Sequence, residues 1–214
     1  MARDYITYNE LLNQRFNAIG FRRKNRETFV KKKGNAVQEL RFGHATYYMH
    51  NVRFYNLNFF IDFPVVYSFS RVIGVEYYPL GGHIAPIIQE KVGWKEWKIS
   101  TDCNENYIIK TVNDICQNVE RYVAPFLDKY SDLDILLDAM EKEKISPDYY
   151  DYVRFPAIAY CMLGNYNKAI EQLHKKKLYI LSKKDKISEI NFEKMTKSFT
   201  EFENAINKYI TESQ

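Results

Sequence analysis

The stretch FYNLNFFIDFP, residues 54–64, decides the fold class of this chain. Apolar side chains alternate in it with Asn and Asp, and a period of two residues is that of a β-strand with one buried face and one wet face. The predicted buried face carries Tyr55, Leu57, Phe59, Ile61 and Phe63. The predicted wet face carries Asn56, Asn58 and Asp62. Pro64 has no backbone N–H to donate to a neighbouring strand, so we expect the strand to end there.

Other segments with extended character lie on both sides of this strand. Before it, KGNA at residues 33–36 has the composition of a tight turn, which predicts a hairpin within residues 21–42. After it, we expect extended segments at VVYSFSRVIGVEYY, residues 65–78, and at EWKIS, residues 96–100. Together these segments predict a mainly antiparallel sheet of about four to six strands.

A helical pattern precedes the sheet. Thr7 and Glu10 have the spacing of a capping box, and Gly20 stands where a glycine commonly ends a helix. Leu11, Leu12, Phe16 and Ile19 recur at helical spacing between them. The pattern predicts a first helix over residues 8–19 that packs on the sheet.

From about residue 101 the apolar pattern is helical to the end of the chain. Residues that favour N-caps predict three helix starts, at Thr101 or Asp102, at Ser131 and at Ser146. We expect Pro125 to kink or close the first of these helices. The predicted fold class is therefore α+β, with an N-terminal helix on a mainly antiparallel sheet and a C-terminal all-helical region. We expect residues 1–100 and 101–214 to form one continuous globular unit.

The stretch AIAYCMLGNYNKAIEQL, residues 157–173, is similar to a tetratricopeptide unit in the spacing of six positions. These positions are Ala157, Tyr160, Gly164, Tyr166, Ala169 and Leu173. Small residues let two helices approach closely, and Gly164 with Asn165 suits a tight turn between them. Arrays of such units need about three members to bury a continuous core, and the sequence contains no second unit. We therefore expect residues 147–177 to form an isolated tetratricopeptide-like hairpin.

A wider resemblance rests on several features taken together. They are GFRRK at residues 20–24, the basic hairpin, FYNLNFFIDFP, a tryptophan segment and VERYVAPFLDKYSDLDILL at residues 119–137. With these features the chain resembles a bacterial family, the domain-of-unknown-function 4304 family, over about residues 5–140. The resemblance implies a bacterial protein, and it supplies no catalytic or ligand-binding residue that can be carried over.

The composition excludes several classes of protein. With 214 residues, 46% of them hydrophobic, the chain can bury a substantial core. Its first residues are charged where a secretory signal needs an apolar run, and no window approaches about 18 uncharged apolar residues. We expect a soluble, cytoplasmic protein without a membrane partner. Cys103, Cys116 and Cys161 are too widely spaced for a disulfide framework or a zinc knuckle, so we expect free thiols.

The charge is uneven along the chain, at +7 over residues 1–100, −6 over residues 101–164 and +3 over residues 165–214. The basic excess includes one candidate binding tract, formed by Arg22, Arg23, Lys24, Arg26, Lys31, Lys32 and Lys33. Such a tract suits a solvated edge or an acidic partner, and it also suits internal pairing with the acidic helical segment. Its alternative role is nucleic-acid binding, although no usual signature of that function accompanies it.

The sequence offers little that predicts a metal site or catalysis. On a regular strand His44 and His50 would lie roughly 20 Å apart, and neither His83 nor His174 has a partner at ligand spacing. The pair of glycines at residues 81–82 matches no phosphate-binding motif, so we expect no cofactor. Cys103 is the one candidate nucleophile, expected in the first turn of a helix, where the helix dipole favours a thiolate.

These observations predict a non-enzymatic protein that binds another macromolecule, for example another protein in the manner of an immunity protein. Two alternatives stay open. The first is nucleic-acid binding through the basic hairpin at residues 22–33, and the second is an enzyme that depends on Cys103.

Overall fold

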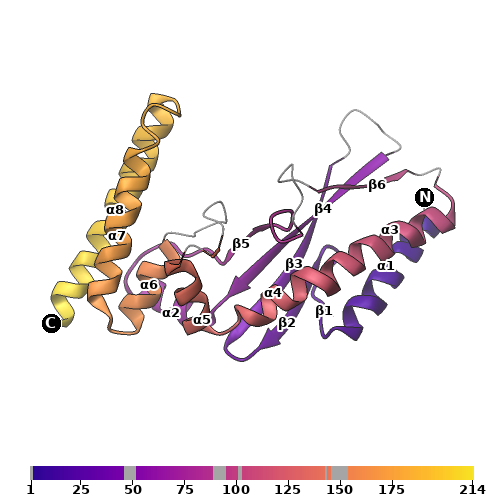
Figure 1. The fold of residues 1–214 in the computed structure, drawn as a ribbon, viewed down its shortest axis with the longest axis horizontal. Helices are drawn as coiled ribbons and strands as arrows, with labels where there is room; N and C mark the ends of the chain where they lie inside the picture. The colour runs from indigo at the N-terminus through magenta and orange to yellow at the C-terminus, as the bar shows by residue number, and fades with distance from the viewer. Residues whose placement is uncertain (1, 46–51, 89–94, 101–102, 143, 146–153) are drawn as a thin grey trace. The chain divides into compact units, whose positions relative to one another are not determined.

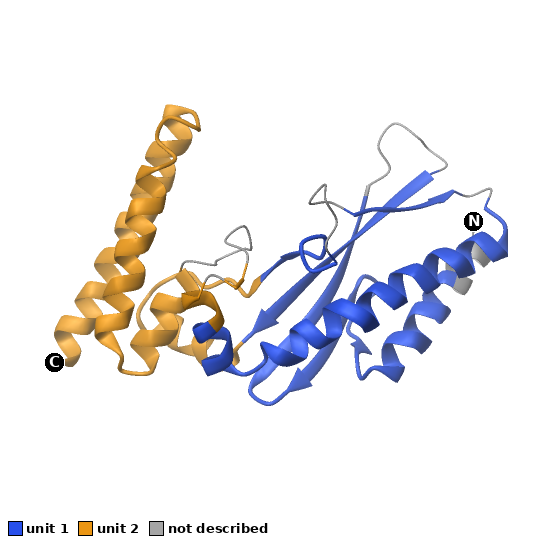
Figure 2. Cartoon of the chain, viewed as in Figure 1, with its two compact units in different colours: residues 1–62, 81–138 blue, residues 63–80, 139–214 orange. Residues whose placement is uncertain are grey.

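The computed structural model describes residues 2–45, 52–88, 95–100, 103–142, 144–145 and 154–214. The chain divides into two compact units (Figure 2). Unit 1 comprises Met1–Asp62 and Gly81–Asp138, and unit 2 comprises Phe63–Leu80 and Ala139–Gln214. The fold class is α+β, as predicted, with a helix before a mainly antiparallel sheet and helices after it (Figure 1). The helices predicted from residue 101 onward are divided between the two units.

Six strands form one sheet in the described part of the chain. They are β1 (Arg22–Arg23), β2 (Thr28–Lys33), β3 (Ala36–Ala45), β4 (Val52–Asp62), β5 (Leu80–His83) and β6 (Trp97–Ser100). The order is β1-β2-β3-β4-β5, and β6 also pairs with β4. The strand predicted from FYNLNFFIDFP is therefore β4, and it lies between β3 on one edge and β5 and β6 on the other.

The predicted hairpin and the predicted last strand are confirmed. Lys33 pairs with Ala36 across the β2–β3 turn, and Gly34 takes a φ of 56°, a conformation that favours glycine. EWKIS supplies β6, which pairs antiparallel with β4 so that Trp97 lies opposite Tyr55. Both segments thus have the turn or strand character that their composition indicates.

Alternation along β4 separates an inner face from an outer face, as predicted. Tyr55, Leu57, Phe59 and Ile61 point inward and are buried, whereas the residues between them are only half-buried. On the neighbouring β3, Leu40 lies opposite Phe59 and shares the inner face. The inner face is therefore the sheet's contribution to the core of unit 1.

Phe63 is buried, but it does not lie on the strand. β4 ends at Asp62, and Phe63 is the N-cap residue of α2 (Pro64–Val72) in unit 2, where its ring lies 5.8 Å from that of Phe155. The predicted strand at residues 65–78 is wrong, because residues 65–72 belong to this helix. Pro64 fits the first turn of a helix, where no N–H is needed, and Val66 and Ser70 are buried one turn apart.

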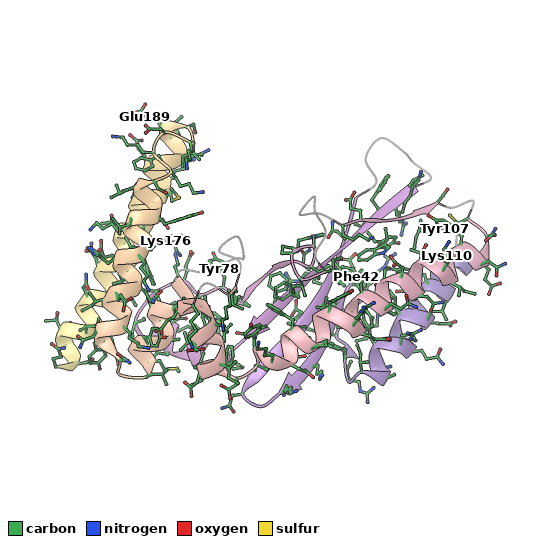
Figure 3. All side chains as sticks on the ribbon, viewed as in Figure 1. Phe42, Tyr78, Tyr107, Lys110, Lys176 and Glu189 are labelled. Atoms are coloured by element: carbon green, nitrogen blue, oxygen red, sulfur yellow. The ribbon has the colours of Figure 1, made fainter. Side chains whose placement is uncertain are left out.

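The inner face is covered by helices of unit 1 (Figure 1). They are α1 (Ala2–Ala18), α3 (Glu105–Asn118), the π-helical turn η1 (Val119–Val123) and α4 (Ala124–Lys129). From α1, Phe16 stacks on Phe42, a residue labelled in Figure 3, at 6.1 Å between ring centroids. From α4, Phe126 contacts Phe59 edge-on at 5.3 Å. Aromatic rings thus join helices and sheet.

The end of α1 is as predicted, and its start is not. Gly20 has a φ of 90°, and the N–H groups of Gly20 and Phe21 donate to the carbonyls of Asn17 and Phe16, which is a Schellman motif. The helix begins at Ala2, so Thr7 lies inside it and is not an N-cap. The helix therefore starts before the position that the capping-box spacing favoured.

The helix starts predicted at Thr101 or Asp102 and at Ser131 differ from the observed starts. Residues 101–102 and 146 lie outside the described residues, and the observed N-cap of α3 is Asn104, whose side chain accepts from the Tyr107 N–H at 2.9 Å. Ser131 does not cap the next helix, α5 (Leu133–Glu141), because its hydroxyl donates to the Leu127 carbonyl. The side chain of Asp132 accepts a hydrogen bond from the Ile135 N–H in the first turn of α5. Pro125 follows η1, so the predicted kink is a π-helical turn.

Unit 2 contains α2 and the C-terminal helices α6 (Arg154–Met162), α7 (Tyr166–Leu181) and α8 (Glu189–Ser213). The predicted hairpin is α6 and α7, joined by a Schellman turn in which Gly164 has a φ of 72°. Four of its predicted packing positions are buried, namely Ala157, Tyr160, Ala169 and Leu173. The first part of the range predicted for the hairpin, residues 147–153, lies outside the described residues.

Gly81 on β5 lies very close to β4. A Cβ atom added to it would stand 2.1 Å from the Phe59 carbonyl oxygen, which is backbone and cannot rotate away. We predict that Gly81→Ala lowers the free energy of unfolding by about 3 kcal/mol, measured by urea denaturation. The control is Gly43→Ala, where the three atoms nearest to the new methyl all belong to the Asn56 side chain, which can rotate away. Equal losses of unfolding free energy in the two variants would show that the close approach of the Gly81 backbone to the Phe59 backbone does not limit stability.

Candidate functional site

The seven residues of the predicted basic tract do not share one surface. Alternation along β1 and β2 turns Arg23, Lys31 and Lys33 toward the inner face, because their register partners are the buried residues Phe29, Gln38 and Ala36. Arg22 and Lys32 occupy the opposite parity and lie on the outer face with exposed side chains. Lys24 continues the outer set beyond β1, and Arg26 lies in the connection to β2.

The inner lysines are neutralised within unit 1 by a carboxylate on α4. Lys31 Nζ lies 2.8 Å from one oxygen of Asp128, and Lys33 Nζ lies 3.1 Å from the other. The buried amide of Gln38 donates to the same carboxylate at 2.8 Å and to the Ser131 hydroxyl at 2.8 Å. Two of the seven cations of the tract are therefore paired internally, between the sheet and the acidic helical segment.

The ionisation of Asp128 reflects these contacts. Partial burial by itself raises the pKa of the carboxyl, but hydrogen bonds from Lys31, Gln38 and Lys33 outweigh that effect and lower the pKa to about 2. The Asp128 carboxylate is therefore ionised in the folded protein at neutral pH. Its hydrogen bonds join β2 and β3 to α4.

Arg23 serves the local structure of the β1–β2 connection. Its guanidinium donates to the carbonyls of Asn25 at 3.1 Å and Arg26 at 2.8 Å, and it also donates to the Asn9 side chain of α1. The same group lies 5.5 Å from the centroid of the Phe29 ring. Arg23 therefore holds the connection against α1.

The cations that remain on the outside form a surface that we call the outer basic face. It consists of Arg22, Lys24, Lys32, Arg41 and Lys98. All five are exposed, and the half-buried rings of Phe54 and Phe60 lie on the same side of the sheet. Among the described residues, Glu39 and Asp62 are carboxylates at outer positions of β3 and β4. Arg41 and Lys98 were not predicted from the sequence, because their place on this surface depends on the register across β3, β4 and β6.

Some charges on the outer basic face already interact with one another. Arg41 Nε donates to Glu39 at 2.8 Å, and its guanidinium lies 4.6 Å from the centroid of the Phe60 ring. Lys24 lies 3.8 Å from the other oxygen of Glu39. These contacts fix Arg41 over the ring and leave the net charge of the surface positive.

A small hollow lies at the other face, between α1 and the inner face of the sheet. Its polar lining includes Arg26, Glu27, His44 and Arg53, and Tyr8 stacks beside Tyr55 with ring centroids 4.9 Å apart. His44 Nδ1 lies 3.2 Å from Glu27. The cavity volume is about 20 Å³, which is room for a water molecule and far less than the several hundred Å³ of a typical ligand site.

The histidines and acids form no metal site in the part of the chain that the structure describes, where no three His, Cys, Asp or Glu side chains cluster. His83 accepts from the Ala85 N–H through Nδ1 at 3.2 Å, so its Nε2 donates to the Lys95 carbonyl at 3.0 Å. Burial lowers the pKa of His83, and the bond to Lys95 partly opposes that effect. His174 is exposed on α7, and His50 lies outside the described residues.

Cys103 was predicted to lie in the first turn of a helix, and that prediction is wrong. The residue lies just before Asn104, the N-cap of α3. Its sulfur accepts a hydrogen bond from the Ser100 N–H at 3.2 Å. The three cysteines are free, with Cys116 and Cys161 buried and Cys103 half-buried. Burial raises the pKa of Cys116 to about 12 and that of Cys161 to about 11, which makes both thiols unreactive near neutral pH.

Comparison with known proteins finds no match, whether to a protein-family model, to a curated protein or to a solved structure. No helix among the described residues is both long enough and apolar enough to cross a lipid bilayer.

The bonds of Asp128 predict a pH dependence of stability. Since the folded-state pKa of about 2 lies below the ordinary value of 3.8, the stabilisation is present above about pH 4 and is lost as the pH falls toward 2. We expect Asp128→Asn to lower the free energy of unfolding by about 1–2 kcal/mol at pH 7. In urea titrations the gap to wild type should close near pH 2. The control Asp185→Asn, at an exposed site in the connection between α7 and α8, should change stability little at either pH.

Alkylation tests the role of Cys103. In the native protein we expect iodoacetamide to modify Cys103 first and at no more than the rate of free cysteine, because Cys103 is half-buried, whereas the other two cysteines are buried, and it lies outside the helix. Peptide mapping by mass spectrometry gives the rate at each thiol. A markedly faster reaction at Cys103 would support the alternative that the protein is a Cys103-dependent enzyme.

Proposed function

We propose that this protein is a non-enzymatic, cytoplasmic binding protein whose outer basic face docks an acidic surface of another protein. The observation that carries the proposal is the sorting of charge by the sheet. Lys31 and Lys33 are bound internally by Asp128, whereas the side chains of Arg22, Lys32 and Lys98 on the outer basic face are exposed. Charge complementarity across such a face speeds association with an acidic partner and disfavours partners whose surface is also basic.

The composition of the face also fits a protein partner. Arginine and aromatic side chains are enriched in protein–protein interfaces, and here Arg41 stands over Phe60 in the middle of the sheet. Half-buried apolar residues such as Val30 and Val37 lie among the cations, so docking would bury apolar area as well as pair charges.

A nucleic acid is the second candidate, and two features disfavour it. Single strands are held by stacking bases on open aromatic rings, but the guanidinium of Arg41 already lies against the Phe60 ring. Glu39 and Asp62 lie among the cations and would repel phosphates.

A binding assay with two labelled probes tests the proposal. The probes are a poly-glutamate peptide and a single-stranded oligo-dT of equal charge, followed by fluorescence anisotropy at several salt concentrations. We expect the peptide to bind more tightly than the DNA. The triple variant Arg22→Glu/Lys32→Glu/Lys98→Glu should weaken peptide binding about tenfold, at about 0.5 kcal/mol for each exposed charge.

The matched control carries the same charge change on unit 2. Lys184→Glu/Lys186→Glu/Lys194→Glu alters three exposed lysines of the α7–α8 hairpin and should leave peptide binding close to wild type. Equal weakening by both triple variants would mean that net charge alone drives binding. If oligo-dT binds more tightly than the peptide, with a steep salt dependence, the proposal of a protein partner is wrong and nucleic-acid binding is favoured.

A further inference from the structure

α7 carries two apolar stripes, and only one is covered. Ala169, Leu173 and Ile180 are buried at the spacing of a helix that packs on its neighbours α6 and α8. A second stripe runs along another side of the same helix, at spacings of four, four and three residues. We call it the α7 seam, and it consists of Ile170, His174, Leu178 and Leu181.

The α7 seam is open to solvent. Ile170 is 46% exposed, Leu178 60% and Leu181 55%, and His174 is also exposed. At about 100° per residue the four side chains fall within one quarter of the helix circumference, which is the geometry of a seam that receives a second helix. A water-facing side of a surface helix would ordinarily be polar at these positions.

We propose that the α7 seam pairs with the α7 seam of a second copy of this chain, with the two helices antiparallel and a two-fold axis passing beside His174. Ile170 and Leu178 lie four residues before and after His174, or about 6 Å along the helix in each direction. The axis therefore places Ile170 of each copy against Leu178 of the other. Ile170, His174 and Leu178 are thus self-complementary about the axis, as an isologous interface requires, and Leu181 lies opposite Asn167 of the other copy.

The charges beside the seam fit the same arrangement. Glu171 and Lys175 lie along one side of it and form an ion pair of 2.8 Å within the helix. Across the proposed axis, Glu171 of one copy lies about 3 Å along the helix direction from Lys175 of the other, within reach of both side chains. On the opposite side Lys177 is already bound by Glu203 of α8 at 3.2 Å, so its charge is balanced.

A second copy fits the surface better than a lipid bilayer does. The connection between α7 and α8 forms the far end of this hairpin, labelled near Glu189 in Figure 3, and it carries Lys183, Lys184, Asp185 and Lys186. Inserting that end into hydrocarbon would bury these charges. Pairing along the side of α7 leaves them in water.

Sedimentation velocity over a concentration series tests the pairing. We expect the wild-type chain to shift from monomer to dimer as its concentration rises, and Leu178→Asp to raise the dimer dissociation constant at least tenfold. Ile190→Asp is the matched control, because Ile190 is 64% exposed on α8 and lies outside the seam. Circular dichroism confirms that each variant is folded. A wild type that stays monomeric, or a Leu178→Asp variant that dimerises like wild type, would overturn the proposal.

Cysteine cross-linking tests the axis. In a Cys103→Ser background, His174→Cys should form an interchain disulfide under mild oxidation, whereas Asn204→Cys at an exposed site on α8 should not. A mixture of Ile170→Cys and Leu178→Cys chains should cross-link to each other more than either does to itself. Preferential self-linking of Ile170→Cys would indicate parallel helices and would refute the antiparallel arrangement.

Discussion

Contact between the inner face of β4 and the helices α1 and α4 is the interaction on which the rest of unit 1 depends. Tyr55 meets Tyr8 of α1, and Phe59 meets Phe126 of α4, so one strand joins the first helix of the chain to a helix more than 100 residues later. Burying each large aromatic contributes about 1.5–3 kcal/mol. Because β4 is paired along both edges, this burial also holds β3, β5 and β6 in register.

The same constraint sorts the charges. Once β4 has set which face is buried, the pairing of β2 with β3 sends every second lysine of KKK toward the core. Lysine on that side needs a carboxylate partner, since a cation loses much of its hydration there. Asp128 supplies it from α4, and the charge that is left on the outside becomes the candidate binding surface.

Much of the sheet could be predicted because its signals are local. The alternation in residues 54–62, the turn at residues 33–36 and the glycines Gly20 and Gly164 each act through a few neighbouring residues, and each is observed as expected. The helix at α2 was missed for the opposite reason. Its valines favour a strand locally, but Pro64 and the burial of Val66 and Ser70 favour a helix.

The sequence by itself determined the α+β class, the central strand and the presence of a strongly basic tract. Only the tertiary structure decided which of those cations meet a partner. Arg41 and Lys98 join Arg22, Lys24 and Lys32 on one surface because the register between strands brings them there, and Asp128 reaches Lys31 across 97 residues of chain. Such pairings are set by packing between distant segments, and spacing along the chain carries no record of them.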